Sequence, residues 1–211
     1  MGRSELKWQA HPVLREYALR TGARCLIAVP AGREKRPTGG RSGDALYRRG
    51  VKRHASLIPL SHDHHDALVL AQGLILGRSR APRSDWPTDR RTQVDRVVAF
   101  FAQTLRSHFE IEETHLFPTV VARLPREANL VAHLLEEHTA MRTQIRDLER
   151  DPASELEVRL PSLGRLLEAH IRREERVLFE TMQREMEPAD LETLGTHLRA
   201  RAREGAACRV S

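Results

Sequence analysis

The chain carries the same pattern twice, as HFEIEETHLF at residues 108–117 and as HIRREERVLF at residues 170–179. Both stretches read H-x3-E-E-x2-L-F, and they lie 62 residues apart. Successive residues of an α-helix are rotated by about 100°, so the glutamate four positions after the histidine shares its face. Each stretch therefore offers one imidazole and one carboxylate to the same side of a helix, next to a leucine that is expected to face a core.

One further histidine precedes each stretch on a helix of its own. His64 lies in SHDHHDALVLA (residues 61–71), and His138 lies in LLEEHTAM (residues 134–141). The chain thus repeats the order H … HxxxE, with one set for each expected helical hairpin. His65 shares a face with Val69 and Leu76, so it is a weaker candidate than its neighbour.

The apolar spacing from His54 onward predicts helices and no alternating strand. Pro118 is expected to kink or end the second helix. Four long amphipathic helices with short connections favour an all-α, antiparallel four-helix bundle with a short C-terminal helix. The helices are expected at about 60–77, 89–118, 126–151 and 154–186, with the last one after Pro188.

Composition agrees with a helical fold that has an aliphatic core. Of the 211 residues, 40% are hydrophobic and only 4% are aromatic. No apolar run approaches a membrane span, and no apolar leader is readable at the N-terminus. Cys25 and Cys208 form no CxxC pair, so neither a thiolate zinc site nor a disulfide framework is expected. We therefore expect a cytoplasmic protein without membrane contact.

The net charge of +6 is distributed unevenly along the chain. Residues 1–53 hold 13 Lys and Arg against 4 acids, whereas the rest of the chain is mildly acidic. The segment is rich in Gly, Pro, Arg and Ser, which predicts a largely disordered basic extension before a bundle domain at 54–205. Because no nucleic-acid motif accompanies the charge, a solvated tail is the preferred interpretation.

The inward histidines and glutamates predict a metal site. A buried carboxylate is costly unless it is paired or metal-bound. Ion pairs among these residues could instead stabilise a metal-free core, but the repeated spacing favours metal. Six side chains are too many for one tetrahedral zinc and suit two ions bridged by two glutamates, for which iron, manganese and zinc are all candidates. The candidate ligands are His64, His108, Glu112, His138, His170 and Glu174.

The glutamates directly after Glu112 and Glu174 are expected to point in a different direction from those two candidate ligands. Glu113 and Glu175 lie five positions after the histidines and are rotated by about 140° from them. We therefore expect both side chains to face solvent.

At these residues the sequence resembles the hemerythrin-like family, also called HHE cation-binding domains. The resemblance covers roughly residues 54–203 and includes the closing PADLETLGTHLRAR (residues 188–201). It implies an up-down-up-down four-helix bundle around two non-haem iron ions, with the six candidates as ligands and both glutamates bridging.

Two positions depart from the oxygen-carrying hemerythrins. Those proteins have a histidine where this chain has Leu134. They also have an aspartate five residues after the fourth-helix histidine, whereas Glu174 of this chain lies four residues after His170. These features resemble the broad bacterial HHE branch. One ion is then expected to be less fully coordinated, or to take a ligand from His65, His133 or Glu137.

The leading functional hypothesis is a di-iron protein, monomeric or homodimeric, that binds or senses dioxygen or a related species such as peroxide or nitric oxide. A second hypothesis is an oxidase- or peroxidase-like detoxifying enzyme, which needs a proton donor near the metal. Glu113 and His115 flank that region but are expected to point outward, so binding is preferred. A third hypothesis is a metal-dependent regulatory module that uses the basic extension to contact a partner.

Overall fold

The computed structural model describes residues 52–79 and 85–207, with side chains as far as residue 199. The expected disorder of the extension falls almost wholly on residues 1–51, which lie outside the described residues. No described helix is both long enough and apolar enough to cross a membrane.

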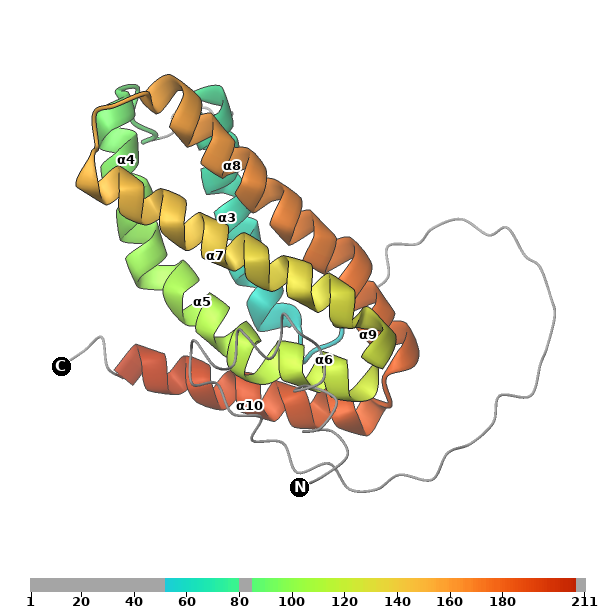
Figure 1. Ribbon diagram of the computed structural model, residues 1–211. Coiled ribbons are helices and arrows are strands. Elements are labelled where there is room, and N and C mark those ends of the chain that lie inside the picture. The colour runs from blue at the N-terminus through green and yellow to red at the C-terminus, as the bar shows by residue number, and fades with distance from the viewer. Residues whose placement is uncertain (1–51, 80–84, 208–211) are drawn as a thin grey trace.

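The described chain is all-helical and forms a bundle of two helical hairpins, closed by a fifth helix (Figure 1). This confirms the predicted fold class. The first hairpin pairs α3 with a long second helix that runs without a break from Arg90 to Arg123. The second hairpin pairs α7 with a fourth helix that runs from Leu156 to Glu185. The elements are α3 (Ile58–Leu76), α4 (Arg90–Phe100), η1 (Phe101–Leu105), α5 (Arg106–Ile111), η2 (Glu112–Leu116), α6 (Phe117–Arg123), η3 (Pro125–Glu127), α7 (Ala128–Arg150), α8 (Leu156–Arg173), η4 (Glu174–Leu178), α9 (Phe179–Glu185) and α10 (Pro188–Ala207).

Local sequence signals explain where the first hairpin turns. Helix α3 ends at Leu76 and is capped by Gly77, whose φ of 68° is left-handed and is readily adopted by glycine. The second helix begins after Asp89, whose side chain accepts a hydrogen bond from the backbone N–H of Thr92. These two caps fix the ends of the helices on either side of the connection.

The second helix does not end at Pro118, although ending there was one of the two outcomes expected. It continues to Arg123 because the π-helical segment η2 ends at Leu116, just before the proline. Pro118 then lies in the first turn of α6, where a missing backbone N–H disrupts little. The local change of helical pitch thus accommodates the proline.

Close packing of the first and fourth helices sets the width of the bundle. A Cβ on Gly164 of α8 would lie 2.7 Å from the backbone oxygen of Ala71 on α3. Only glycine fits at this contact without displacing a helix. The close approach lies on the same two helices as His64 and His170, so it helps to fix the distance between them.

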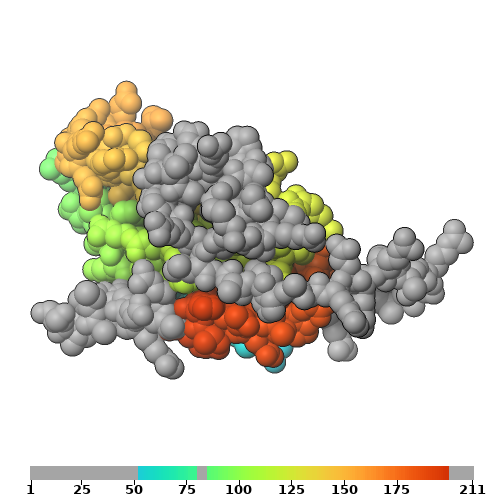
Figure 2. All heavy atoms as spheres, turned by 60° about the horizontal axis from the view of Figure 1, so that its bottom comes forward, coloured from blue at the N-terminus to red at the C-terminus, as the bar shows by residue number. Residues whose placement is uncertain are grey.

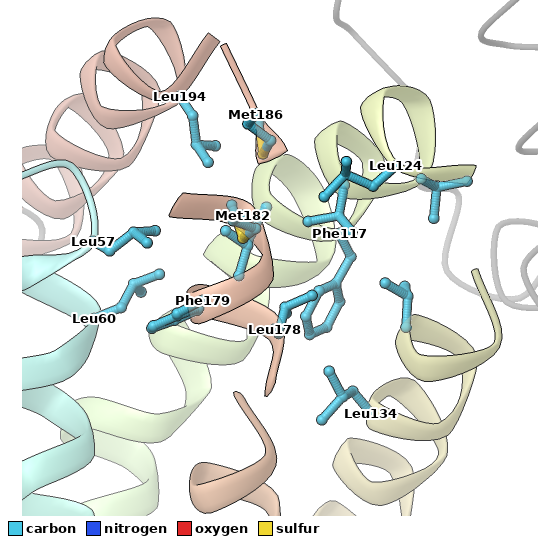
Figure 3. Packing of buried hydrophobic residues seen from close by; sticks show 14 of the residues in the cluster. Leu57, Leu60, Phe117, Leu124, Leu134, Leu178, Phe179, Met182, Met186 and Leu194 are labelled. Carbon is cyan, nitrogen blue, oxygen red and sulfur yellow. The ribbon is translucent and has the colours of Figure 1, made fainter. Parts of the chain in front are cut away.

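Two hydrophobic clusters fill the bundle, one toward each end. The cluster shown in Figure 3 includes Leu57, Phe117, Leu134 and Phe179. The other cluster includes Ala67, Leu105, Met141 and Leu167. On each of the four helices, the candidate metal ligands lie between a residue of one cluster and a residue of the other.

Helix α10 closes the end of the bundle that holds the first cluster. It contacts α5 and η2 and contributes Leu191, Leu194 and Leu198 to the core. Figure 2 shows it in red on one side of the molecule. The expected closing helix is therefore present, and it lies over the segment of the second helix that carries Glu112.

Candidate metal centre

Six buried side chains from the four bundle helices meet between the two core clusters. They are the six residues that the sequence singles out, and none is more than 2% exposed. Each lies on a different element of the bundle. They are His64 on α3, His108 on α5, Glu112 on η2, His138 on α7, His170 on α8 and Glu174 on η4.

The six side chains form two overlapping groups of four. Both groups contain Glu112 and Glu174, and the ligand atoms of each group lie within 4.8 Å of one another. One group adds His64 and His108 and is called the His64/His108 position below. The other adds His138 and His170 and is called the His138/His170 position.

The inward ring nitrogens and the carboxylates face one another at close range. The Nε2 atoms of His64 and His108 are 3.0 Å apart, as are those of His138 and His170. Glu112 places Oε1 3.2 Å from Nε2 of His108 and Oε2 3.4 Å from Nε2 of His138. It therefore offers one oxygen to each position, which is the arrangement of a bridging ligand.

Glu174 also reaches both positions. Its Oε2 atom lies 3.1 Å from Nε2 of His64 and 3.3 Å from Nε2 of His170. Since His64 and His170 belong to different hairpins, the two glutamates together connect the two halves of the bundle.

The glutamate oxygens test whether a cation fits here. Among the described residues, no donor makes a hydrogen bond in good geometry to any of the four carboxylate oxygens of Glu112 and Glu174, although all four are buried. Leaving buried polar atoms unpaired costs several kcal/mol in an apolar interior, roughly 2–7 per group. Cations on the two positions would satisfy these oxygens, so the donor set fits a pair of metal ions.

Each inward histidine is also held from behind by a carboxylate, and only one of the four, Glu137, was named in the sequence analysis as a possible ligand. The Nδ1 atom of His64 donates to Glu175 over 2.7 Å, and that of His138 donates to Glu113 over 2.8 Å. A hydrogen bond at Nδ1 fixes the tautomer and leaves Nε2 free to bind a metal.

The other two histidines are held in the same way from the preceding helix. His108 donates Nδ1 to Asp63 over 3.0 Å, and His170 donates Nδ1 to Glu137 over 3.0 Å. Asp63 directly precedes His64 in the sequence, and Glu137 directly precedes His138. The same carboxylate–histidine pairing therefore occurs in both hairpins.

The prediction that Glu113 and Glu175 face solvent is wrong. Glu113 is only 7% exposed, and Glu175 is partly buried. Both lie in π-helical segments that begin at the glutamate before them, η2 and η4. A π turn bonds residue i to i+5, so the α-helical rotation used in the prediction does not apply. The sequence did contain one signal for these two residues, because both stretches repeat a pair of consecutive glutamates.

The expected additional ligands do not enter either group. His65 and His133 are exposed. Glu137 holds a histidine from behind and is not among the grouped ligand atoms. Within the described residues, each position therefore has two histidines and two shared glutamates. This chain has leucine at position 134, where the oxygen-carrying hemerythrins have a histidine, but the two groups still contain equal numbers of ligands.

Charge pairing sets the pKa values of the metal-free site. Burial disfavours the charged imidazole of His108, but Glu112 and Asp63 outweigh it and raise the pKa of His108 to about 9. The pKa values of His64 and His138 are raised for the same reason, against burial. Burial acts to raise the pKa of Glu112, but the imidazolium of His108 holds it well below its usual range.

The metal-free protein should lose stability as the pH rises. The pKa of His108 lies above its unfolded value of about 6.5, so its contribution is complete below pH 6.5 and is lost through about pH 9. The melting temperature of chelator-treated protein should therefore fall between pH 6.5 and 9.5, and His108→Gln should flatten this dependence. Metal needs neutral imidazole, so the temperature increase produced by metal should grow over the same range. A melting temperature of the metal-free protein that rises with pH would contradict the assignment.

Aromatic rings cover two of the histidines. Phe109 stacks on His138 with ring centroids 3.8 Å apart, and Phe179 stacks on His64 at 5.6 Å. Phe109 and Phe179 are both buried. The rings restrict the orientation of the imidazoles and keep water away from them.

Comparison with known proteins agrees with the fold and the site. The family described as the Hemerythrin HHE cation binding domain matches residues 56–199. This range includes all six grouped residues and covers more than half of the chain. The chain therefore belongs to the hemerythrin HHE cation-binding family. Neither a curated protein nor a solved structure matches it.

Proposed function

We propose that this protein holds two iron ions and binds dioxygen or a related small species, such as peroxide or nitric oxide. The observation that carries the proposal is the set of four buried carboxylate oxygens on Glu112 and Glu174, which accept no well-aligned hydrogen bond within the described residues and face four imidazole Nε2 atoms. The ligands would be His64 and His108 at one position and His138 and His170 at the other, with both glutamates shared.

The chemistry of the donors limits the choice of metal. All six are imidazole nitrogens or carboxylate oxygens, a set that suits iron, manganese and zinc. The resemblance to hemerythrins, which implies non-haem iron, favours iron among these three metals. Four protein donors at each position leave room in the coordination shell for a small ligand, and bound ferrous iron would supply electrons to it.

The chain's own contribution is to hold the ligands and to exclude water. Asp63, Glu113, Glu137 and Glu175 keep a proton on each Nδ1 atom, so that every imidazole presents Nε2 to the centre. Leu105, Leu116, Leu134 and Leu178 are at most 3% exposed and lie within a turn of the ligands on their helices. A dry, preformed site needs little reorganisation to take up a small apolar molecule.

Binding is favoured over enzymatic turnover because both of the expected proton donors, Glu113 and His115, are engaged by other side chains in the described part of the chain. Glu113 is engaged by His138 and Arg142, and the ring of His115 stacks on His197 at 5.6 Å. Steady consumption of peroxide by iron-loaded protein would reverse this preference. The basic extension lies almost wholly outside the described residues, so the regulatory alternative gains no support from the structure.

The test is an absorption spectrum of protein loaded with ferrous iron without oxygen and then exposed to dioxygen, peroxide or nitric oxide. At least one of them should change the spectrum at a stoichiometry set by the iron content. Zinc-loaded protein is the matched control, because zinc occupies similar ligands but has no redox chemistry. An iron-loaded protein whose spectrum responds to none of the three would contradict the proposal.

A further inference from the structure

The two metal positions have the same ligands but different supports. Each position has two histidines and shares both glutamates. Behind each histidine lies one carboxylate, and the four carboxylates differ in what holds them in turn. Since outer carboxylates fix the orientation of metal-binding histidines, this difference bears on how firmly each position is built.

The His138/His170 position is supported by two buried glutamates, and each glutamate is held by a partly buried arginine on a helix. Arg142 donates to both oxygens of Glu113, over 2.7 and 3.1 Å, and Arg173 is hydrogen-bonded to Glu137. The two glutamates are each 7% exposed. Both arginines lie on long helices, in α7 and at the end of α8. Each arginine is therefore fixed by the same helix that carries the histidine of its position.

The His64/His108 position is supported less firmly. The side chain of Asp63 behind His108 is 43% exposed, and no arginine within the described ranges pairs with it. Glu175 behind His64 is held by Ser61 and by Arg53, and Arg53 precedes α3 in a segment without regular structure. One support is thus open to water, and the other depends partly on a residue outside the bundle helices.

Arg53 contacts both groups that restrain His64. Besides pairing with Glu175, its guanidinium lies 5.2 Å from the ring centroid of Phe179, which stacks on His64. It also donates to the side chain of Gln183 over 3.3 Å. A displacement of this one arginine would loosen the hydrogen bond and the stacking of His64 together.

We propose that the two positions are kinetically inequivalent, and that the His64/His108 position exchanges its ion faster, with Arg53 as its positioning residue. The inference rests on the proposed two-metal function. For an ion to leave, a histidine must turn away from it and water must enter. Both steps are easier where one outer carboxylate is exposed to water, as Asp63 is, and the other is held by a residue outside the helices, as Glu175 is held by Arg53. No arginine in the described part of the chain neutralises Asp63, so its charge attracts a cation and raises the affinity of this position. The proposal therefore concerns the rate of exchange and not the affinity.

The test is the release of ferrous iron from fully loaded protein to a coloured chelator, without oxygen. Two phases of equal amplitude should appear, separated by about tenfold or more in rate. Native mass spectrometry of the same samples should show a species with one ion accumulating between the phases. His108→Gln should abolish the fast phase, whereas His170→Gln should abolish the slow one.

Arginine variants separate positioning from a general structural role. Arg53→Gln should accelerate the fast phase alone, and Arg53→Lys should restore part of the original rate. Arg142→Gln and Arg173→Gln are the matched controls and should accelerate the slow phase alone. If Arg53→Gln accelerates both phases equally, Arg53 is merely structural and the proposal is overturned.

The remaining outcomes distinguish this inference from the proposed function. Two bound ions released in a single phase would overturn the inequivalence and leave the two-metal site intact. A wild-type protein that binds fewer than two ions would overturn the proposed function and the inference with it.

Discussion

Replacing Glu174 by alanine is expected to have the largest effect on metal binding of any single change in this protein. Glu174 belongs to both groups of ligands, and its Oε2 atom lies within 3.3 Å of a histidine from each hairpin. Its loss removes a shared ligand and one negative charge from both positions at once. Metal content should fall from two ions per chain to one or fewer, and the increase in melting temperature on adding metal should largely disappear.

Glu180→Ala is the matched control for this change. Glu180 lies six residues further along the same helix, and its side chain is exposed. This variant should keep two ions per chain and the wild-type response to metal. A Glu174→Ala protein that still holds two ions would refute the assignment of Glu174 as a bridging ligand.

The second large effect is expected from Glu113→Ala, which leaves all six proposed ligands in place. Glu113 accepts the Nδ1 proton of His138 and pairs with Arg142, and it is buried. Without it, His138 loses the bond that fixes its tautomer, and a positive charge is left beside the site. Loss of such a partner typically lowers metal affinity by about 10–100-fold. Titration with metal in the presence of a competing chelator measures this change.

Glu110→Ala provides the comparison, because Glu110 lies three residues earlier on the same helix and is exposed. The Glu110→Ala protein should bind metal with the same affinity as the wild-type protein. The role of Glu113 behind His138 would be rejected if both variants bound metal equally well. Circular dichroism of the two proteins should be indistinguishable, since neither change removes an apolar side chain of the two hydrophobic clusters.

The sequence was sufficient to predict the helices and the six grouped residues. The i, i+4 spacing from His108 to Glu112 and from His170 to Glu174 places each pair on one face of any near-regular helix. Leucines at one-turn intervals show that this face is buried, as Leu116 and Leu178 are. These signals depend on local periodicity alone, and local periodicity is what a single sequence records.

The inward orientation of Glu113 and Glu175 was not predicted because it depends on a change of helical pitch. Glu113 and Glu175 would face solvent in a regular α-helix, and the π-helical segments η2 and η4 turn them toward a neighbouring hairpin. A single inserted turn of this kind leaves no periodic signal. The same change let the second helix continue past Pro118, where the sequence predicted a kink or an end.

The arginines were missed for a different reason. Arg142 and Arg173 on helices, and Arg53 in the segment before α3, pair with carboxylates 29 to 122 residues away in the sequence. Long charged side chains on helices are usually solvated, so spacing gives no reason to select these three from the other arginines. Only the packing of the helices brings their guanidinium groups to the buried glutamates.

The most direct test of this account is the metal content of the full chain purified after expression in iron-replete medium, measured by mass spectrometry. The account predicts two iron ions per chain, held by four histidines and two shared glutamates. A protein that contains no metal, and takes up none when ferrous iron is added, would contradict it. The buried histidines and glutamates would then be a metal-free polar core.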